Sequence, residues 1–309
     1  RLAYGIYAMN SGQGTAGIEV RKTIFSDCRR GIYISGFNPV ESQVFMNNAF
    51  TNYRFCAKTG DDTYGLYLNN STGFQVQNNS FVGDTALGKA QYGVVVNNSL
   101  ARPNFIYKNN FSSLTYALTG LNINRGEYYF PDFMLPKTVP YTIAETGLCF
   151  VCNTFTDNVN DICDTDEDSY TSGTGITYFQ KNKTDPGYPE REPAGNTFSS
   201  SHKDSTGVYD IYFDPTVGHI EYSYHAQSQI PGLRLSPDKV NYENKITKRP
   251  FSYEYSASSC PNDFYMEGNG DEEKAKIEIA GSKIDSLIFV LLGLIDEGLT
   301  DTLREEVEN

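Results

Sequence analysis

A short phrase that begins with two asparagines and ends in phenylalanine recurs at a nearly constant spacing in the first third of the chain. Its asparagine pairs begin 31 residues apart (47 to 78 and 78 to 109) in Asn47-Asn48-Ala49-Phe50, Asn78-Asn79-Ser80-Phe81 and Asn109-Asn110-Phe111. Between these copies runs a second phrase, in which glycine precedes alternating apolar residues, as in Gly65-Leu66-Tyr67-Leu68. A fixed period of two short β-type phrases is typical of a solenoid whose turns stack on one another. We therefore expect a mainly β chain with a right-handed parallel β-helix over residues 1–220.

Stacked turns predict two columns of identical side chains. Equivalent residues of neighbouring parallel strands lie about 4.8 Å apart, so side-chain amides can donate to the turn below while phenyl rings stack inside. Two later, less regular phrases extend both columns beyond residue 150. The predicted amide ladder is Asn48, Asn79, Asn110, Asn153 and Asn196, and the predicted ring column is Phe50, Phe81, Phe111, Phe155 and Phe198.

The repeat fades after residue 220, and two further segments follow. Proline, serine and tyrosine dominate residues 221–270, which we interpret as an irregular connector or β cap. From residue 271 to residue 309, alanine, lysine, leucine and glutamate recur at helical spacing, which predicts the start of an α-helical segment. The first residues already read as part of a repeat, so we expect the chain to be a piece of a longer protein.

Composition excludes several classes of partner. The net charge is −13 and the pI is near 4.7, so a nucleic-acid backbone or an anionic membrane would be repelled. The longest apolar run, 287–292, is far shorter than the roughly 20 residues of a membrane span. The six cysteines are expected to form disulfides in a secreted protein or to be buried thiols, and the sequence does not choose among their possible pairings.

The chemistry that parallel β-helix hydrolases need is incomplete in this sequence. The phrases Asn153-Thr154-Phe155 and Asn196-Thr197-Phe198 carry phenylalanine where such a hydrolase carries an acid, and phenylalanine cannot move a proton. We therefore favour a chain without catalytic residues, although an enzyme stays an alternative. An acidic run offers calcium ligands or, more simply, a solvated loop, and we expect no cofactor apart from this calcium candidate. Its candidate ligands are Asp161, Asp164, Asp166 and Asp168.

Tyrosines alternate in the late part of the chain, and this pattern has two interpretations. They are either surface aromatics that contact sugar rings or members of cross-strand packing pairs. The sequence leaves both open for Tyr209, Tyr212, Tyr222, Tyr224, Tyr253 and Tyr255.

Several phrases resemble the β-helix region of large secreted surface proteins of Bacteroidota. They are Gly65-Leu66-Tyr67-Leu68-Asn69-Asn70, Asn78-Asn79-Ser80-Phe81, 147–155 and the helix junction 294–300, where Glu297 and Leu299 depart from the pattern. The resemblance implies a surface or extracellular protein exported by the type IX secretion route, and it carries over no catalytic residue.

Together these observations predict a non-catalytic structural or adhesive β-helix module of a larger exported bacterial surface protein. The alternatives are a carbohydrate-active enzyme, either a polysaccharide lyase or a glycoside hydrolase, and a glycan-binding module without turnover. An enzyme would need acidic residues from adjacent turns about 5–10 Å apart. The expected partners are a surface glycan or protein ligand and the bacterial export machinery. The sequence does not specify the ligand.

Overall fold

The computed structural model describes residues 4–10, 17–26, 28–37, 43–51, 63–84, 90–100, 104–125, 147–166, 175–177, 193–256 and 259–260. These residues belong to the first of two compact units, Arg1–Pro261. The second unit, Asn262–Asn309, lies outside the described residues, and so does the α-helical segment predicted over 271–309.

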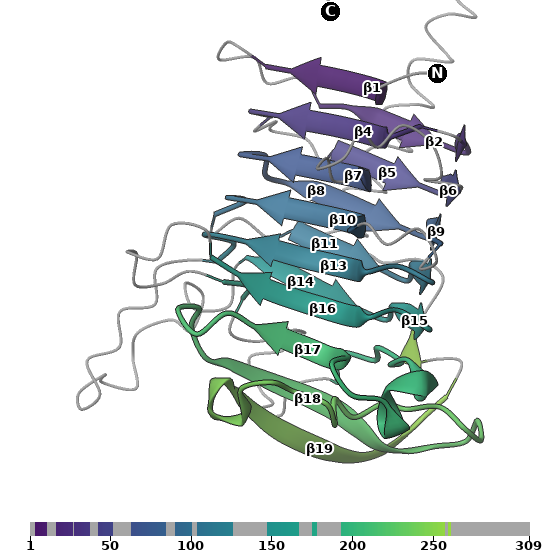
Figure 1. Cartoon of the computed structure of the whole chain (residues 1–309), viewed down its shortest axis with the longest axis vertical. Helices are drawn as coiled ribbons and strands as arrows, with labels where there is room; N and C mark the ends of the chain where they lie inside the picture. Colours follow the sequence, from purple (N-terminus) through teal and green to yellow (C-terminus); the bar gives the residue numbers. More distant parts are fainter. Residues whose placement is uncertain are drawn as a thin grey trace, which may run out of the picture. The chain divides into compact units, whose positions relative to one another are not determined.

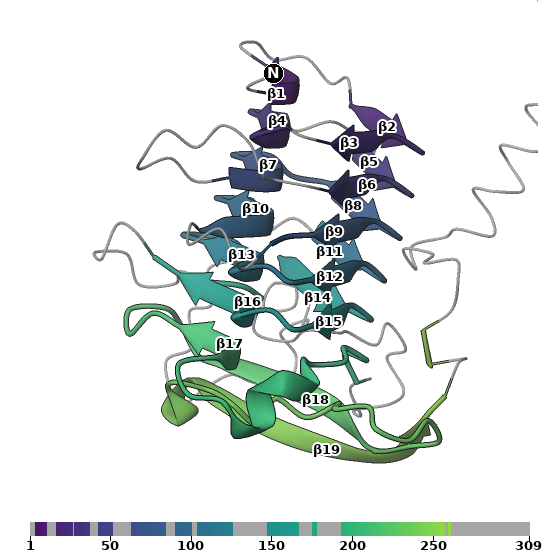
Figure 2. The ribbon, with the colours of Figure 1, turned by 45° about the vertical axis from the view of Figure 1, so that its right-hand side comes forward.

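The described strands of the repeat form three parallel sheets (Figures 1 and 2). Each of the first five coils contributes one strand to each sheet in turn, and the last two coils contribute β16 and β17 to the first sheet. The first sheet contains β1 (Tyr4–Met9), β4 (Arg30–Ser35), β7 (Thr63–Asn69), β10 (Gln91–Asn97), β13 (Tyr116–Leu121), β16 (Asn160–Thr165) and β17 (Tyr209–Phe213). The second contains β2 (Glu19–Arg21), β5 (Gln43–Met46), β8 (Phe74–Gln77), β11 (Asn104–Tyr107) and β14 (Leu148–Val151). The third contains β3 (Ile24–Ser26), β6 (Ala49–Thr51), β9 (Ser80–Val82), β12 (Asn110–Ser112) and β15 (Thr154–Thr156). The predicted parallel β-helix is confirmed.

A column of phenylalanines fills the interior behind the third sheet. The rings of Phe25, Phe50 and Phe81 are stacked, with centroids 4.8 and 4.6 Å apart, and the stack continues through the later coils. The remaining members are Phe111, Phe155 and Phe198. All six rings are buried, so each coil adds apolar area to one continuous core.

Glycine lies near the start of β1, β4, β7 and β10, where the phenylalanine column lies against the backbone. A Cβ on Gly31 would lie 2.8 Å from the ring of Phe50 and 2.3 Å from the carbonyl of Gly65. A Cβ on Gly93 would lie 2.7 Å from the ring of Phe111. The recurring Gly-Ile/Leu/Val phrase is therefore a packing requirement.

A ladder of asparagine amides runs beside the rings at the corner between the second and third sheets. Each amide donates through Nδ2 to the Oδ1 of the next coil, and that Oδ1 also accepts the backbone N–H of the donating residue. Its members are Asn48, Asn79, Asn109, Asn153 and Asn196, all of them buried.

The fourth coil corrects one predicted ladder position. The ladder residue there is Asn109, whereas Asn110 is exposed and pairs with Ser80 and Thr154 in the third sheet. The reason is the corner geometry, in which the residue before the ladder asparagine has a left-handed backbone. That residue is Asn78 (φ 53°) in the third coil but Lys108 (φ 53°) in the fourth, so the spacing between ladder residues is one residue shorter there.

Two long strands follow the stacked coils and pair in parallel with each other. β18 (Ile220–Ser228) and β19 (Ile246–Tyr255) form a separate sheet below β17, and the 3₁₀ segments Ser200–Asp204 and Glu243–Lys245 precede them (Figure 1). Strand β19 contains Lys248, Arg249 and Pro250, residues that discourage pairing with a further strand. A disulfide joins Cys152 to Cys260 and so fastens the end of this region to the coils. The division into segments 1–220, 221–270 and 271–309 stays a prediction.

Candidate functional site

The outward face of the first sheet carries two columns of mostly aromatic side chains. The register aligns equivalent positions of seven strands, so residues far apart in sequence lie one above another. One column is Tyr4, Arg30, Tyr64, Tyr92, Tyr116, Asn160 and Tyr209. The other is Tyr7, Tyr33, Tyr67, Val95, Thr119, Cys163 and Tyr212. We call this surface the tyrosine face.

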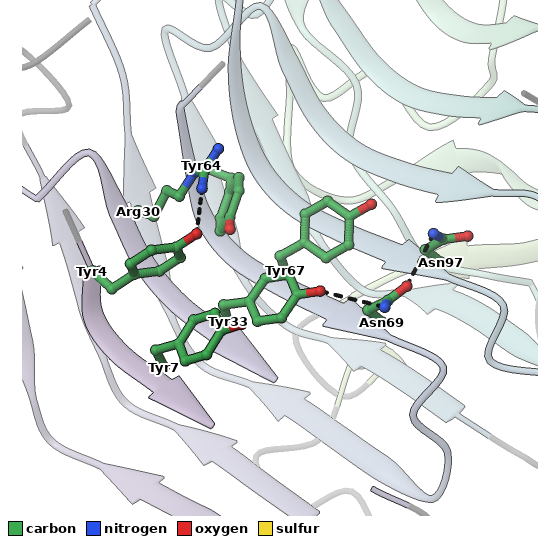
Figure 3. Close-up of a pocket in the computed structure, with 8 residues that line it drawn as sticks. All are labelled: Tyr4, Tyr7, Arg30, Tyr33, Tyr64, Tyr67, Asn69 and Asn97. Carbon is green, nitrogen blue, oxygen red and sulfur yellow. Dashed lines mark hydrogen bonds between the residues drawn. The ribbon is translucent and has the colours of Figure 1, made fainter. Parts of the chain in front are cut away.

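A hollow of about 440 Å³ opens on the tyrosine face over β1, β4, β7 and β10 (Figure 3). Its lining residues are Tyr4, Tyr7, Arg30, Tyr33, Tyr64, Tyr67, Asn69 and Asn97. This volume is in the range of small-ligand sites. The hollow is therefore large enough to hold part of a ligand chain.

Among the rings that line the hollow, one pair is stacked and the others are tilted or meet edge-on. Tyr7 and Tyr33 are nearly parallel (10°) with centroids 5.1 Å apart, whereas Tyr4 meets Tyr7 edge-on at 67°. Tyr64 and Tyr67 are tilted by 57°. Stacked rings cover one another's faces, so this surface presents ring edges and phenol hydroxyls to a ligand.

Arg30 lies between two tyrosines of its own column. Its guanidinium carbon is 5.1 Å from the ring centroid of Tyr4 and 5.4 Å from that of Tyr64, and it also donates a hydrogen bond to the Tyr4 hydroxyl (Figure 3). Cation–π contacts of this kind hold the side chain in place. Burial raises the pKa of the Tyr64 phenol far above its usual value, so this hydroxyl stays protonated and can donate.

Amides border the hollow on its other side. Asn69 donates to Ser35 Oγ at 3.1 Å and accepts from Asn97 Nδ2 at 3.1 Å, and Asn97 in turn accepts from Asn122 (Figure 3). The tyrosine face thus combines apolar ring edges, hydroxyls and amides. Its two columns contain no Asp or Glu, although the chain has 38 acidic residues.

A second cluster of functional groups lies inside the last coils. Asp161 and Asp210 occupy the interior position that glycine holds in earlier coils, and His202 of the first 3₁₀ segment joins them. His202 Nδ1 is 2.9 Å from Asp210 Oδ1 and 3.7 Å from Asp161 Oδ2, and all three side chains are at most 1% exposed. Among the described residues, this is the only group of His, Cys and acidic side chains close enough to share one ion.

The acceptors beside both ring nitrogens favour a doubly protonated His202. Nε2 is 2.6 Å from the carbonyl of Asn158, which can only accept, and Nδ1 faces the carboxylate of Asp210. Burial by itself lowers the pKa of His202, but the Asp210 hydrogen bond and the Asp161 charge outweigh it and raise the pKa. Arg234 donates to both oxygens of Asp210 at 3.1 and 2.7 Å. The cluster is a buried network of hydrogen-bonded charges.

Two of the four predicted calcium ligands, Asp161 and Asp164, accept hydrogen bonds from neighbouring groups of the protein. Asp161 accepts from Asn158, from Ser199 Oγ and from the Ser199 N–H. Asp164 is fully buried, where desolvation raises its pKa to about 7, and it accepts the N–H of Ile176. Asp166 ends the same stretch with 9% exposure, and Asp168 lies outside the described residues.

The late tyrosines divide between the two interpretations. Tyr209 and Tyr212 belong to the tyrosine face, whereas Tyr222 is fully buried and accepts a hydrogen bond from the last ladder residue, Asn196. The side chain of Tyr253 lies outside the described residues, and Tyr255 contacts His225 edge-on. Sequence reasoning missed the early tyrosines that line the hollow, and the signal for them was tyrosine one residue before or two residues after the recurring glycine.

Comparison with known proteins identifies one family. The family model described as NosD, periplasmic copper-binding protein, matches residues 1–200. No curated protein and no solved structure matches the chain. Within the part of the chain that the structure describes, no helix has the length and apolar character needed to span a membrane.

We expected no cofactor, apart from calcium as a candidate ion. The family match corrects this expectation, because the matched family is described as copper-binding. The cluster around His202 does not fit a copper ion. Both ring nitrogens donate hydrogen bonds, so neither lone pair is available, and the Arg234 guanidinium occupies the side where Asp210 would bind a cation. A copper site in this chain would have to use other residues.

Proposed function

This chain belongs to the NosD family, and from that membership we propose that it is an exported, non-catalytic β-helix module of a larger bacterial cell-surface protein. The module acts as a stiff adhesive segment whose tyrosine face contacts a ligand at the cell surface, either a glycan or a protein. The single observation that carries this proposal is the in-register alignment of tyrosines from six of the seven strands, all except β16, on one outward face.

Among the described residues, the acidic pair that a carbohydrate-active enzyme would need is found inside the protein. Asp161 and Asp210 come from adjacent coils, and each offers an oxygen within 4.8 Å of the other. Both carboxylates are fully buried and bound by donors, so no substrate reaches them. A glycosidase needs its acid pair on either side of a bound sugar. The geometry therefore favours binding over turnover.

Export through the type IX route, with the bacterial export machinery as a partner, is supported by the sequence resemblance to Bacteroidota surface proteins. The family description as periplasmic supports passage across the cytoplasmic membrane. Protease treatment of intact cells that produce the full-length protein tests the location. We expect the β-helix to be cleaved while a cytoplasmic marker stays intact, and protection of both would contradict surface exposure.

Adhesion and turnover are tested with the purified chain. Beads coated with it should adhere to a ligand-coated surface, and beads coated with a Tyr7→Ala/Tyr33→Ala variant should adhere at least tenfold less. The chain should release no reducing ends or unsaturated products from pectin, alginate or neutral polysaccharides over long incubation. Depolymerisation of any of them would overturn the non-catalytic proposal.

A further inference from the structure

We propose that the hollow on the tyrosine face is a binding site for an extended, uncharged glycan chain. This inference rests on the proposed function and deepens it, because it names the class of ligand.

The chemistry of the lining suits a sugar. A pyranose chain presents C–H groups and hydroxyls close together, and the hollow presents ring edges, phenol hydroxyls and side-chain amides in the same alternation. Tyr7 is 54% exposed, so its ring and hydroxyl are directly accessible. Asn69 and Asn97 provide amide groups at the opposite border. Aromatic groups with a polar end are well suited to such amphipathic ligands.

The periodicity of the face suits a chain-like ligand. Equivalent side chains recur once per coil, at about the 4.8 Å spacing of parallel strands. That advance is comparable to the length of one pyranose unit in an extended chain. Beyond the hollow, Tyr92 and Tyr116 continue the first column with centroids 4.8 Å apart. A ligand lying along the columns would meet the same kinds of group at each step.

The charge of the face argues for an uncharged ligand. A net charge of −13 repels polyanions such as polyuronates at long range. Arg30 is the one cation in the two columns, and its guanidinium is already held by Tyr4 and Tyr64. The absence of Asp and Glu from the columns removes the groups that would attract a cationic ligand. What remains is a neutral face with many hydrogen-bonding groups.

The test is binding of the whole chain to an array of unbranched neutral oligosaccharides, such as β-glucans, xylans and mannans, beside polyuronate oligosaccharides. We expect binding to at least one neutral chain and a gain in affinity with chain length. The Tyr7→Ala/Tyr33→Ala variant should lose at least tenfold in affinity, whereas Ile24→Ala should bind like the parent, because Ile24 is a 74% exposed residue of β3 in the third sheet and lies outside the tyrosine face.

A second double variant distinguishes loss of binding from loss of folding. Tyr7→Phe/Tyr33→Phe keeps the stacked rings and removes only the hydroxyls, so its thermal unfolding should match the parent while its affinity falls several-fold. The inference is overturned if no neutral glycan binds, if only polyuronates bind, or if the alanine variant binds like the parent. It is also overturned if the chain dimerises and the alanine variant is monomeric, since the face would then be a self-association surface. Adhesion that depends on Tyr7 and Tyr33 without glycan binding would leave the proposed function standing and overturn only the ligand class.

Discussion

Replacement of Asn109 by alanine is predicted to destabilise the β-helix strongly, whereas the same change at Asn110 is predicted to do almost nothing. The two residues are adjacent and chemically identical, so they form a matched pair. Asn109 is buried in the amide ladder, and Asn110 is exposed on the third sheet. The two alanine variants have the same amino-acid composition, so a difference between their stabilities reports the contribution of the ladder position.

The magnitude follows from the hydrogen bonds that the Asn109 side chain makes. Its Oδ1 accepts the backbone N–H of Asn79 at 2.9 Å, and its Nδ2 donates to the carbonyl of Val76 at 2.9 Å. In the alanine variant both groups stay buried and lose this partner, and a buried unsatisfied group costs about 1–3 kcal/mol. The free energy of unfolding should therefore fall by about 2–6 kcal/mol. A solvent-facing change such as Asn110→Ala should stay within about 0.5 kcal/mol of the parent.

Urea unfolding followed by far-UV circular dichroism measures both effects. The chain has no tryptophan, so tyrosine fluorescence provides the second probe. Equal destabilisation by both variants, or a larger effect of Asn110→Ala, would refute the ladder as the source of stability at this corner. A large change in the dependence on urea concentration would show instead that the variant alters the unfolded state.

Three further predictions concern the last coils. Burial raises the pKa of Asp164 from its ordinary 3.8 to about 7, so between about pH 4 and pH 7 the folded state keeps a proton that the unfolded state loses. The free energy of unfolding of the parent should therefore fall by up to about 4 kcal/mol as the pH rises through this window, and it should fall less in Asp164→Asn. A flat or rising profile in the parent would contradict this prediction. Replacing both Cys152 and Cys260 by serine should lower the free energy of unfolding by about 2–5 kcal/mol, and reduction of the disulfide in the parent should reproduce the effect. Unchanged unfolding of the double serine variant and of the reduced parent would refute a stabilising role for the disulfide. His202→Gln should destabilise the chain by about 3–5 kcal/mol because it leaves buried Asp161 without its cationic neighbour, while Asp210 keeps Arg234. The bound copper measured by mass spectrometry after dialysis should stay unchanged, and loss of one copper ion per chain would contradict the assignment of this cluster as a charge network.

The architecture was predictable from the sequence because every coil needs the same residues at the same positions. Asparagine, phenylalanine and glycine each make a contact that one coil requires, and the same residues recur because the same contact is made again in the next coil. The ladder position of the fourth coil was mispredicted because Asn109-Asn110 was aligned by its asparagine pair. In every coil the ladder asparagine lies two residues before the phenylalanine, as Asn79 does before Phe81 and Asn109 before Phe111, and that spacing gives the correct register.

The candidate site was harder to predict because it depends on register between strands. Tyr4, Tyr33 and Tyr67 lie in three different coils, and only the pairing of β1, β4 and β7 brings them together on one face. The charge network around His202 likewise joins residues that are up to 73 positions apart, from Asp161 to Arg234, with Asp161 replacing glycine in the interior column. Single residues in the sequence carry no sign of such partners.

The central functional claim is that this module binds a glycan chain and leaves it intact. The most direct measurement is to incubate the chain with a soluble neutral polysaccharide that it binds, separate the complex by size exclusion with light scattering, and then determine the polysaccharide's mass after protein removal. We predict co-elution that is lost in Tyr7→Ala/Tyr33→Ala and an unchanged polysaccharide mass. Shortened chains, or co-elution that persists in this variant, would contradict the claim.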